Sequence, residues 1–277
     1  MNNKTVLITG TSSGFGKSAA KFFAANGWNV IATMRSPEKE QELTSSDNML
    51  LLQLDVQDEN SIQKAIQSGI KAFGAIDVLV NNVGYAVRGV FESLSREQIR
   101  KQFDVNVFGL MDVTHAIIPH FRENGKGLII NISSMGGIIT FPLLSLYHSA
   151  KFAVEGFSEA LSYELSAVNI GIKLIEPGSV QTNFGSTSID SVPNAIPAYD
   201  DMISYYAENR PKLVKHVTTA TANEVAEIIY KAANDGTKQF RYVVGGDAGF
   251  FIQGKTTNSD EDYIKLMNSY FLPPSTD

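Results

Sequence analysis

The feature that most constrains the fold is a short apolar run at residues 5–9, which leads directly into a glycine-rich turn and then a helical pattern. A run of this length, bounded by turn residues, predicts a buried strand. The same alternation of apolar strand and amphipathic helix recurs along the chain. Strands that are apolar on both faces belong to a parallel sheet covered by helices on either side. The order of the elements therefore predicts an α/β fold.

The predicted elements alternate almost to the end of the chain. Strands are expected at residues 6–9, 29–34, 49–54, 77–80, 127–132, 172–175 and 240–244. Helices are expected at residues 18–26, 38–43, 61–73, 99–121, 146–168 and 221–233, and Pro119 is expected to break the fourth of these. The glycine-rich turn follows the first strand, whereas the phosphate site of a TIM barrel usually comes late. We therefore expect a doubly wound, Rossmann-type sheet with helices on both faces.

No Pro/Gly/Ser-rich linker divides the 277 residues, and we expect a single dinucleotide-binding catalytic domain over residues 1–277. Residues 185–215 interrupt the alternation and are rich in Ser, Pro, Asn, Asp and Tyr. This segment follows the carboxyl end of a strand, where ligands bind in open α/β sheets, so it is predicted to be a substrate lid. The alternative is a mobile surface excursion without a role in binding.

Composition excludes several classes of function. The net charge of -6, without a cluster of Lys and Arg, argues against a nucleic-acid partner. The apolar run near the N-terminus is too short for a signal peptide or a membrane span, so no membrane partner and a cytoplasmic location are expected. The chain has no cysteine, which excludes disulfides and thiolate chemistry. The four histidines have no metal-ligand spacing, and no metal site is expected.

The glycine-rich turn is the first candidate for cofactor binding. Glycines let the backbone approach a pyrophosphate closely, and the following helix N-terminus offers free N–H groups. The spacing here is G-x-x-x-G-x-G rather than G-x-G-x-x-G, and the alternative is a tight turn without a ligand. The candidate residues of this turn are Gly10, Ser12, Ser13, Gly14, Phe15 and Gly16.

The end of the second predicted strand indicates which cofactor is used. An NAD-selective fold usually places an acid here to hold the ribose 2′-hydroxyl, but this chain has Met34 followed by Arg35. Arginine binds phosphate with parallel hydrogen bonds, so NADP is expected in preference to NAD. The alternative is that Arg35 is a solvated surface residue. Asp55 and Val56, after the third strand, are placed to reach the adenine, although Asp55 could simply cap the following turn.

The candidate catalytic pair is Tyr147 and Lys151, which lie four residues apart at the start of a predicted helix and share one face. A lysine cation favours the phenolate and lowers the pKa of a tyrosine, whose ordinary value is about 10. Tyr147 could then donate a proton to a forming alkoxide or accept one in the reverse direction. Such a pair alone is common by chance, and the alternative is an ordinary exposed pair on a helix.

Polar residues near the predicted strand ends provide the context for this pair. Ser133 and Ser134 follow the fifth strand, where a hydroxyl could hydrogen-bond a substrate carbonyl. Asn82 follows the fourth strand. Asn106 lies in an apolar part of the next helix and needs a partner, either a water or a backbone carbonyl. The alternative is that these asparagines are structural.

With these motifs in their order and spacing, residues 5–182 resemble the short-chain dehydrogenase/reductase family. The resemblance implies a single doubly wound domain with a seven-stranded parallel sheet. It also implies a catalytic tetrad, carried here by Asn106, Ser134, Tyr147 and Lys151, with Ser134 preferred over Ser133 by its separation from the tyrosine. It assigns further cofactor contacts to Asn82, Gly84, Tyr147, Lys151, Pro177, Gly178, Val180 and Thr182. Val83 departs from the alanine that is most frequent in the family.

Within the family, residues 147–156 and Arg35 are most similar to the hydroxysteroid and retinol dehydrogenase-like branch. The expected function is hydride transfer between NADP(H) and a carbonyl or secondary alcohol, with reduction favoured and a small, fairly apolar substrate. Predicted pocket walls are Phe141, Leu143, Leu144, Phe184 and residues 199–206, with ordinary packing as the alternative. Other hypotheses are a non-catalytic NADP-sensing regulator and an epimerase or dehydratase. The family often forms homodimers or homotetramers, and either is expected here.

Overall fold

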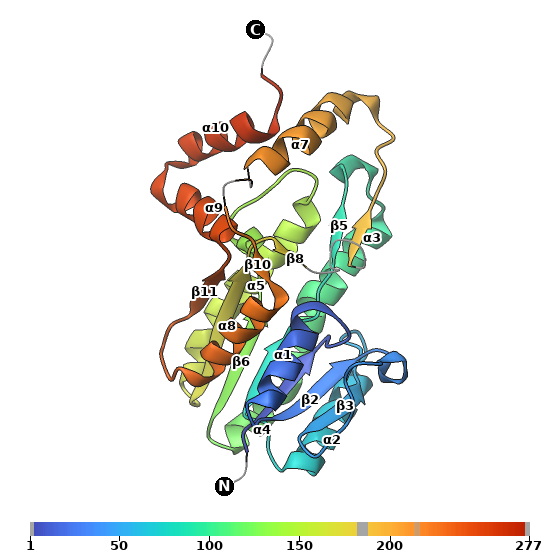
Figure 1. Cartoon of the computed structure of the whole chain (residues 1–277), viewed down its shortest axis with the longest axis vertical. Helices are drawn as coiled ribbons and strands as arrows, with labels where there is room; N and C mark the ends of the chain where they lie inside the picture. Colours follow the sequence, from blue (N-terminus) through green and yellow to red (C-terminus); the bar gives the residue numbers. More distant parts are fainter. Residues whose placement is uncertain (1–2, 182–187, 214, 216, 275–277) are drawn as a thin grey trace.

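A seven-stranded sheet, in which every neighbouring pair of strands is parallel, forms the centre of the computed structural model (Figure 1). The structure describes residues 3–181, 188–213, 215 and 217–274. The strands, in order across the sheet, are β11 (Arg241–Val244), β7 (Ile170–Pro177), β6 (Gly127–Ile132), β4 (Val78–Asn81), β1 (Thr5–Thr9), β2 (Asn29–Met34) and β3 (Met49–Gln53). The order reverses between β1 and β4, which creates the switch point where doubly wound folds bind their ligands.

Helices cover both faces of this sheet, as the sequence predicts. One face carries α1 (Gly14–Ala25) and α8 (Ala222–Asn234), and the other carries α2 (Glu59–Phe73), α4 (Gly109–Glu123) and α5 (Ser145–Ser166). Side chains of a strand alternate between faces. Accordingly, Val6 and Ile8 pack in the cluster under α1 and α8, whereas Leu7 packs under α2 and α4. The predicted Rossmann-type fold with seven parallel strands is confirmed.

Two predicted helices differ in the structure. Residues 38–43 are not helical beyond a single 3-10 turn, Pro37–Lys39, because Pro37 begins a turn but the polar residues after it bury no apolar stripe. The predicted helix at 99–121 is instead α3 (Arg96–Phe103), a π-helical turn (Asp104–Phe108) and α4. Pro119 lies inside α4 without ending it. Burial of the neighbouring Ile117 and Phe121 offsets the hydrogen bond that Pro119 cannot donate.

Residues 188–213 are more regular than the sequence suggests. They contain β9 (Ile189–Ser191), a 3-10 turn (Pro197–Tyr199) and the helix α7 (Asp200–Leu213), so the expectation of an irregular segment was wrong for this part. Strand β9 pairs in parallel with β5 (Ala86–Arg88), about a hundred residues earlier in the chain. The compositional signal failed because α7 buries little of its own surface and depends on packing against a distant helix.

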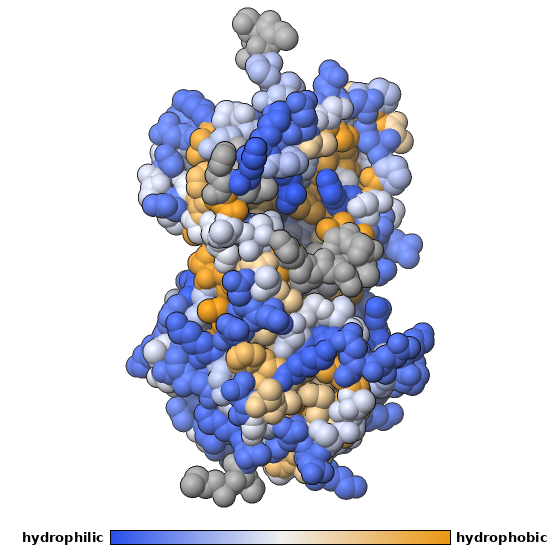
Figure 2. All heavy atoms as spheres, viewed as in Figure 1, coloured by the Kyte–Doolittle hydropathy of each residue, from blue (hydrophilic) through white to orange (hydrophobic). Residues whose placement is uncertain are grey.

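The C-terminal segment supplies that distant helix. It forms α9 (Gly246–Thr257) and α10 (Asp260–Phe271), and α10 packs against α7 above the sheet (Figure 1). Two further short strands, β8 (Val180–Gln181) and β10 (Ala220–Thr221), pair with each other in parallel. Apolar residues gather at the waist between the sheet and these upper helices (Figure 2). Within the described part of the chain, no helix has both the length and the apolar character needed to cross a membrane.

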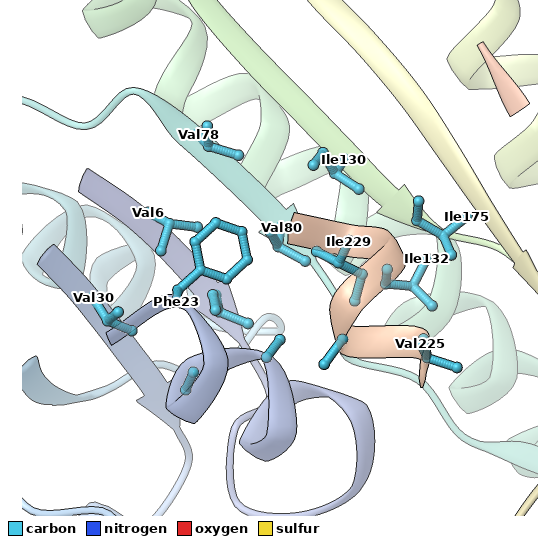
Figure 3. Packing of buried hydrophobic residues seen from close by; sticks show 14 of the residues in the cluster. Val6, Phe23, Val30, Val78, Val80, Ile130, Ile132, Ile175, Val225 and Ile229 are labelled. Carbon is cyan, nitrogen blue, oxygen red and sulfur yellow. The ribbon is translucent and has the colours of Figure 1, made fainter. Parts of the chain in front are cut away.

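The apolar layer between α1, α8 and the sheet centres on Phe23, which is fully buried. Its ring lies 5.0 Å from that of Trp28 and 5.1 Å from that of Tyr230, both in edge-to-face geometry. Figure 3 shows Phe23 beside Val6 of β1, with Ile229 of α8 in the same layer. Phe23 therefore joins the first helix and the last helix of the sheet layer to the central strand.

We expect Phe23→Ala to lower the free energy of unfolding by about 3–5 kcal/mol, because it leaves a cavity in this layer. Urea denaturation followed by circular dichroism measures the loss. Phe91→Ala is the matched control, since Phe91 is 57% exposed and its truncation creates no cavity. Equal losses for both variants would contradict the assignment of Phe23 to the core.

Candidate active site

The glycine-rich turn after β1 is shaped by close backbone contacts. Gly10 and Gly14 have positive φ angles of 72° and 57°, which favour glycine. A Cβ atom on Gly16 would overlap the carbonyl oxygen of Gly10, so only glycine lets α1 approach the turn this closely. Ser13 precedes α1 in an extended conformation, and in the described structure its hydroxyl does not cap the helix. The N–H groups of the first turn are therefore available to an anion.

Asn82 holds this turn from the neighbouring strand. Its Nδ2 donates to the carbonyl oxygens of Thr9 and Gly10, each at 2.9 Å. Its backbone N–H also donates to the hydroxyl of Thr9 at 2.9 Å. Asn82 thus ties the end of β4 to the end of β1, which is a structural role in addition to the predicted one in cofactor binding.

A groove with a volume of about 430 Å³ runs from the glycine turn to the predicted catalytic pair. Most of the predicted cofactor residues line it: Gly10, Ser12, Ser13, Gly14, Phe15, Arg35, Asp55, Val56, Asn82, Gly84, Tyr147 and Lys151. Four of them are not in its lining, namely Gly16, Pro177, Gly178 and Val180. Thr182 and Phe184 lie outside the described residues. A long groove with free N–H groups at one end fits a dinucleotide.

Other residues of the groove were not among the predicted cofactor residues, although Met34, Val83 and Ser133 were named for other reasons. These other residues are Met34, Leu54, Gln57, Val83, Tyr85, Lys101, Val105, Ile132, Ser133, Ser188, Ile189 and Asp190. Several are immediate neighbours of predicted residues and could have been included on that ground. Ile189 and Asp190 lie in the segment predicted as a substrate lid, and the pairing of β9 with β5 brings them to the groove.

A second cavity, of about 380 Å³, adjoins the groove at Arg35 and also contains Lys17 and Lys39. Lys17 is paired with Glu40 and Glu42, at 3.0 and 2.9 Å. Arg35 and Lys39, by contrast, form no ion pair with any residue that the structure describes. This end of the groove therefore offers two uncompensated positive charges, which suits a phosphate group.

Asp55 does cap a turn. Its Oδ1 accepts from the N–H of Gln57 at 3.1 Å, and its own N–H donates to the hydroxyl of Ser61 at 3.0 Å. It also lines the groove, so the two interpretations of Asp55 are compatible.

Of the four predicted catalytic residues, Tyr147 and Lys151 line the far end of the groove, whereas Ser134 and Asn106 are not in its lining. Tyr147 lies in the first turn of α5, and the Ser134 hydroxyl is close enough to its phenol to favour the phenolate. Ser134 Oγ accepts from the N–H of Gly136 at 3.0 Å, which fixes its position. Lys151 follows one turn after Tyr147, and its Nζ donates to the carbonyl of Ile132 at 2.8 Å and lies 5.8 Å from the centre of the Tyr147 ring.

Burial governs the charge states of this pair. It lowers the pKa of the Lys151 ammonium to about 8, against an opposing effect of the Glu155 carboxylate. It raises the pKa of the Tyr147 phenol, and the Ser134 hydroxyl acts in the opposite direction. From the sequence, Lys151 is expected to lower the pKa of Tyr147. In this structure burial raises that pKa instead.

Asn106 lies in the π-helical turn, a distortion that is frequent at functional sites. Its side chain is held by one residue, since Oδ1 accepts from the N–H of Tyr85 at 3.0 Å and Nδ2 donates to the carbonyl of Tyr85 at 2.7 Å. Of the two partners considered for Asn106, the structure therefore provides a backbone carbonyl. A Cβ on Gly84 would lie 3.5 Å from Asn106 Oδ1 and 3.8 Å from Lys151 Nζ. Glycine at this position leaves the space between the two polar side chains open.

Two buried residues that support the site had no sequence signal. Asp247, in the first turn of α9, is fully buried, and its Oδ2 accepts from the N–H of Ser179 at 2.7 Å. It also occupies the space that a side chain at Gly178 would need. The C-terminal segment thus fixes the Pro177–Gly178 loop, a contact between residues about seventy positions apart that no local pattern indicates.

The second is His148, whose ring spans the loop after Ser134. Its Nε2 accepts from the N–H of Phe141 at 2.9 Å, and its Nδ1 lies 2.9 Å from the carbonyl of Gly136. Nδ1 must then carry the proton and donate it. Phe141 itself packs edge-to-face on Phe251 and Phe271. For Phe141, core packing is therefore the interpretation that the structure supports.

Comparisons with known proteins agree with this geometry. Residues 4–191 match the family model described as short chain dehydrogenase. The chain belongs to the short-chain dehydrogenase family. An uncharacterized oxidoreductase of Bacillus subtilis, YusZ, is 41% identical over 258 residues, covering 88% of this chain and 90% of the relative. Retinol dehydrogenase 8 of Bos taurus is 32% identical over 252 residues, covering 86% and 80%.

Among solved structures, ElxO with NADP bound superposes on this short-chain dehydrogenase with a TM-score of 0.75. It is 28% identical and covers 90% of this chain and 99% of its own. The family membership establishes that the protein is an oxidoreductase of the short-chain dehydrogenase type.

The hydrogen bonds of His148 can be tested through the dependence of folding stability on pH. Burial lowers the pKa of its imidazole, so the unfolded chain takes up a proton near the ordinary pKa of about 6.5 while the folded protein does not. Stability that depends on neutral His148 is therefore lost as the pH falls below that value. We expect His148→Gln to be about 1–3 kcal/mol less stable than the parent at neutral pH, because it breaks a buried hydrogen-bond pair.

The difference in stability between the parent and His148→Gln should narrow as the pH is lowered towards 5.5, where the parent loses the same stabilisation. Urea denaturation at a series of pH values between neutral and 5.5 measures this difference. His115→Gln is the control, since His115 is exposed on α4 and should keep the parental dependence on pH. Parallel curves for His148→Gln and the parent would show that His148 does not titrate on unfolding.

Proposed function

We propose that this protein is an NADP(H)-dependent reductase of ketones or aldehydes, which also oxidises the corresponding alcohols. One observation carries the proposal: Tyr147 and Lys151 line one end of a groove, with Ser134 beside Tyr147, and the other end of the groove presents Arg35. The groove thus joins proton-transfer groups to a phosphate-binding end. A regulator that only sensed the cofactor would not need the buried hydroxyl pair of Ser134 and Tyr147.

In the proposed reaction, the substrate carbonyl oxygen binds between the hydroxyls of Ser134 and Tyr147. Ser134, held by the N–H of Gly136, donates a hydrogen bond that stabilises the charge developing on that oxygen. A bound nicotinamide supplies the hydride. Tyr147 then donates its phenolic proton, so that the carbonyl becomes an alcohol.

Lys151 restores that proton in the same scheme. Its ammonium is buried beside Tyr147, and its positive charge stabilises the phenolate that proton donation leaves. Lys151 would also hold the ribose hydroxyls of the cofactor. The open space at Gly84, between Lys151 and Asn106, is suited to a water that passes protons from solvent.

The preference for NADP rests on charge. Met34 stands where an NAD-selective protein would place an acid, and Arg35 and Lys39 face the adjoining cavity without ion-pair partners among the described residues. A 2′-phosphate in this cavity would gain charge-assisted hydrogen bonds from Arg35. The NADP-bound structure of ElxO supports a nicotinamide cofactor, and the choice between NADP and NAD rests on the charge of this cavity.

The proposed substrate is small and fairly apolar. Residues 188–213 bring Ile189 to the groove, and their helix α7 packs against α10, which suits the role of a lid. The likeness to retinol dehydrogenase 8 supports an apolar alcohol or carbonyl compound.

We include in the proposal a single catalytic domain over residues 1–277.

A homodimer or homotetramer also forms part of the proposal. Three large side chains at the end of the π-helical turn and on α5 are exposed: Phe108 at 53%, Phe152 at 46% and Tyr163 at 70%. Apolar groups of this size are often covered by a second subunit.

Tyr147→Phe should reduce kcat for carbonyl reduction by a factor of about 10³ or more, because it removes the proton donor and keeps the ring. NADPH binding, measured by fluorescence titration, should stay close to the parental affinity. Tyr163→Phe, on the exposed side of the same helix, is the control and should retain parental kcat. Turnover by Tyr147→Phe at the parental rate would exclude Tyr147 as the proton donor.

Arg35→Ala should weaken NADPH binding by about tenfold or more and leave NADH binding nearly unchanged, since only NADPH carries the phosphate. Separate fluorescence titrations with the two cofactors measure the ratio. Arg122→Ala, which removes an exposed arginine near the end of α4, controls for the change in net charge. If the parent binds NADH as tightly as NADPH, the NADP preference is wrong.

A further inference from the structure

Behind the catalytic pair lies a buried acidic cluster that the proposed reaction does not use. It consists of Glu155 on α5, Glu176 on β7 and Arg241 on β11. Glu155 and Glu176 are 5% and 1% exposed. The Nε atom of Arg241 lies 3.0 Å from Glu155 Oε2 and 3.2 Å from Glu176 Oε1. Two buried carboxylates thus share one guanidinium nitrogen.

The cluster has an excess of negative charge. The remaining charge on Arg241 is directed at a third acid, because its Nη2 pairs with Glu159 at 2.7 Å on the half-exposed side of α5. Three carboxylates therefore face one cation. Burial, together with the charge of Glu155, raises the pKa of Glu176 to about 7. When Glu155 and Glu176 together hold one proton near neutral pH, that proton is therefore on Glu176. Burial also raises the pKa of Glu155, but Arg241 Nε, which hydrogen-bonds Glu155, and the Lys151 ammonium act in the opposite direction and favour its charged form.

Glu155 is the member of this cluster that lies on the same helix as Lys151. Glu155 lies four residues after Lys151, and the two share a face of α5. Both are buried, so their attraction is screened little by solvent, and the Glu155 charge acts directly on the Lys151 ammonium. Glu176 acts on Glu155 and Arg241, and Lys151 is not among the groups that perturb it.

The loop after Ser134 packs closely against Glu155 and the Lys151 backbone at Gly137. A Cβ on Gly137 would lie 2.8 Å from both Glu155 Cγ and Ser133 Oγ and 3.2 Å from the carbonyl of Lys151. Glycine at 137 therefore allows the loop after Ser134 to lie directly on Glu155. Ser133, which lines the cofactor groove, is the contact between the cluster and the groove.

We propose that Glu155 is a positioning residue for the reaction proposed above, and that its carboxylate, held by Arg241, keeps Lys151 protonated at the pH of turnover. The groups that face Glu155 are Lys151 and Glu159 on its own helix, Ser133 on the adjoining loop, Glu176 on β7 and Arg241 on β11. Without the Glu155 charge, burial alone would act on Lys151 and favour the neutral amine. The lysine could then no longer return a proton to Tyr147.

The first measurement is the titration of Lys151 itself, by competitive labelling with acetic anhydride at a series of pH values and mass spectrometry of the Lys151 peptide. This readout needs no substrate, so it decides about Glu155 even if the proposed reductase activity fails. We expect Glu155→Gln to lower the midpoint of Lys151 by about one pH unit. Glu176→Gln, the matched control from the same cluster, should leave the midpoint at or slightly above the parental value.

The second measurement is the dependence of kcat on pH with a ketone or aldehyde that the parent reduces. In Glu155→Gln the alkaline limb should move to lower pH by the same amount as the Lys151 midpoint, since turnover requires the protonated lysine. Glu155→Asp keeps the negative charge, so its alkaline limb should lie close to the parental one. Glu176→Gln should also have the parental alkaline limb.

Arg241→Gln removes the partner of Glu155 on β11 and leaves α5 unchanged. It therefore replaces Glu155→Gln in both measurements if that variant does not fold. Without Arg241, Glu155 takes up a proton, and the Lys151 midpoint should fall as in Glu155→Gln. The proposal is overturned if Glu155→Gln and Arg241→Gln both keep the parental midpoint. It is also overturned if Glu176→Gln shifts the midpoint as much as Glu155→Gln, because the effect would then belong to the buried cluster as a whole.

Discussion

The hydrogen bonds from Asn82 to the glycine turn are the contact on which the arrangement of the site depends. They join the carboxyl end of β4 to that of β1, at the point where the strand order reverses and no crossover helix fills the gap. The groove begins here. Every other part of the site is positioned relative to it, because β6 and β7 continue the sheet from β4 and carry Ser134 and the loop after Pro177 at the same edge.

Burial then gives the site its chemistry. Lys151 and Ser134 lie in a region from which water is largely excluded, so each charge there is controlled by a few neighbours rather than by solvent. The lysine loses stabilisation from water and regains part of it from Glu155. In the proposed reaction, this gives a role to the acidic cluster next to Tyr147 and Lys151: Lys151 returns the proton to Tyr147, and the charge of Glu155 keeps Lys151 protonated.

Local patterns predicted the elements well where the residues of one segment bury one another. The apolar runs of β1, β2 and β6 and the glycines after β1 were found because strand and turn signals are local. The helix at 38–43 was predicted wrongly, since helical propensity without a buried stripe is insufficient. The helix α7 and the strand β9 were missed because their partners, α10 and β5, lie far away in the chain.

The sequence by itself predicted the doubly wound fold, the glycine turn and the pair Tyr147 and Lys151, since each depends on residue type and spacing along a few consecutive residues. Asn106 and Ser134 joined them as candidates for the catalytic tetrad through the resemblance to the family. Only the tertiary structure decided that Asn82 holds the glycine turn, that Asp247 fixes the loop at Gly178, and that Glu155 meets Arg241. These contacts join segments separated by about seventy residues or more. Their existence depends on which strands lie side by side and on what is excluded from water, and neither is written in any local stretch of the chain.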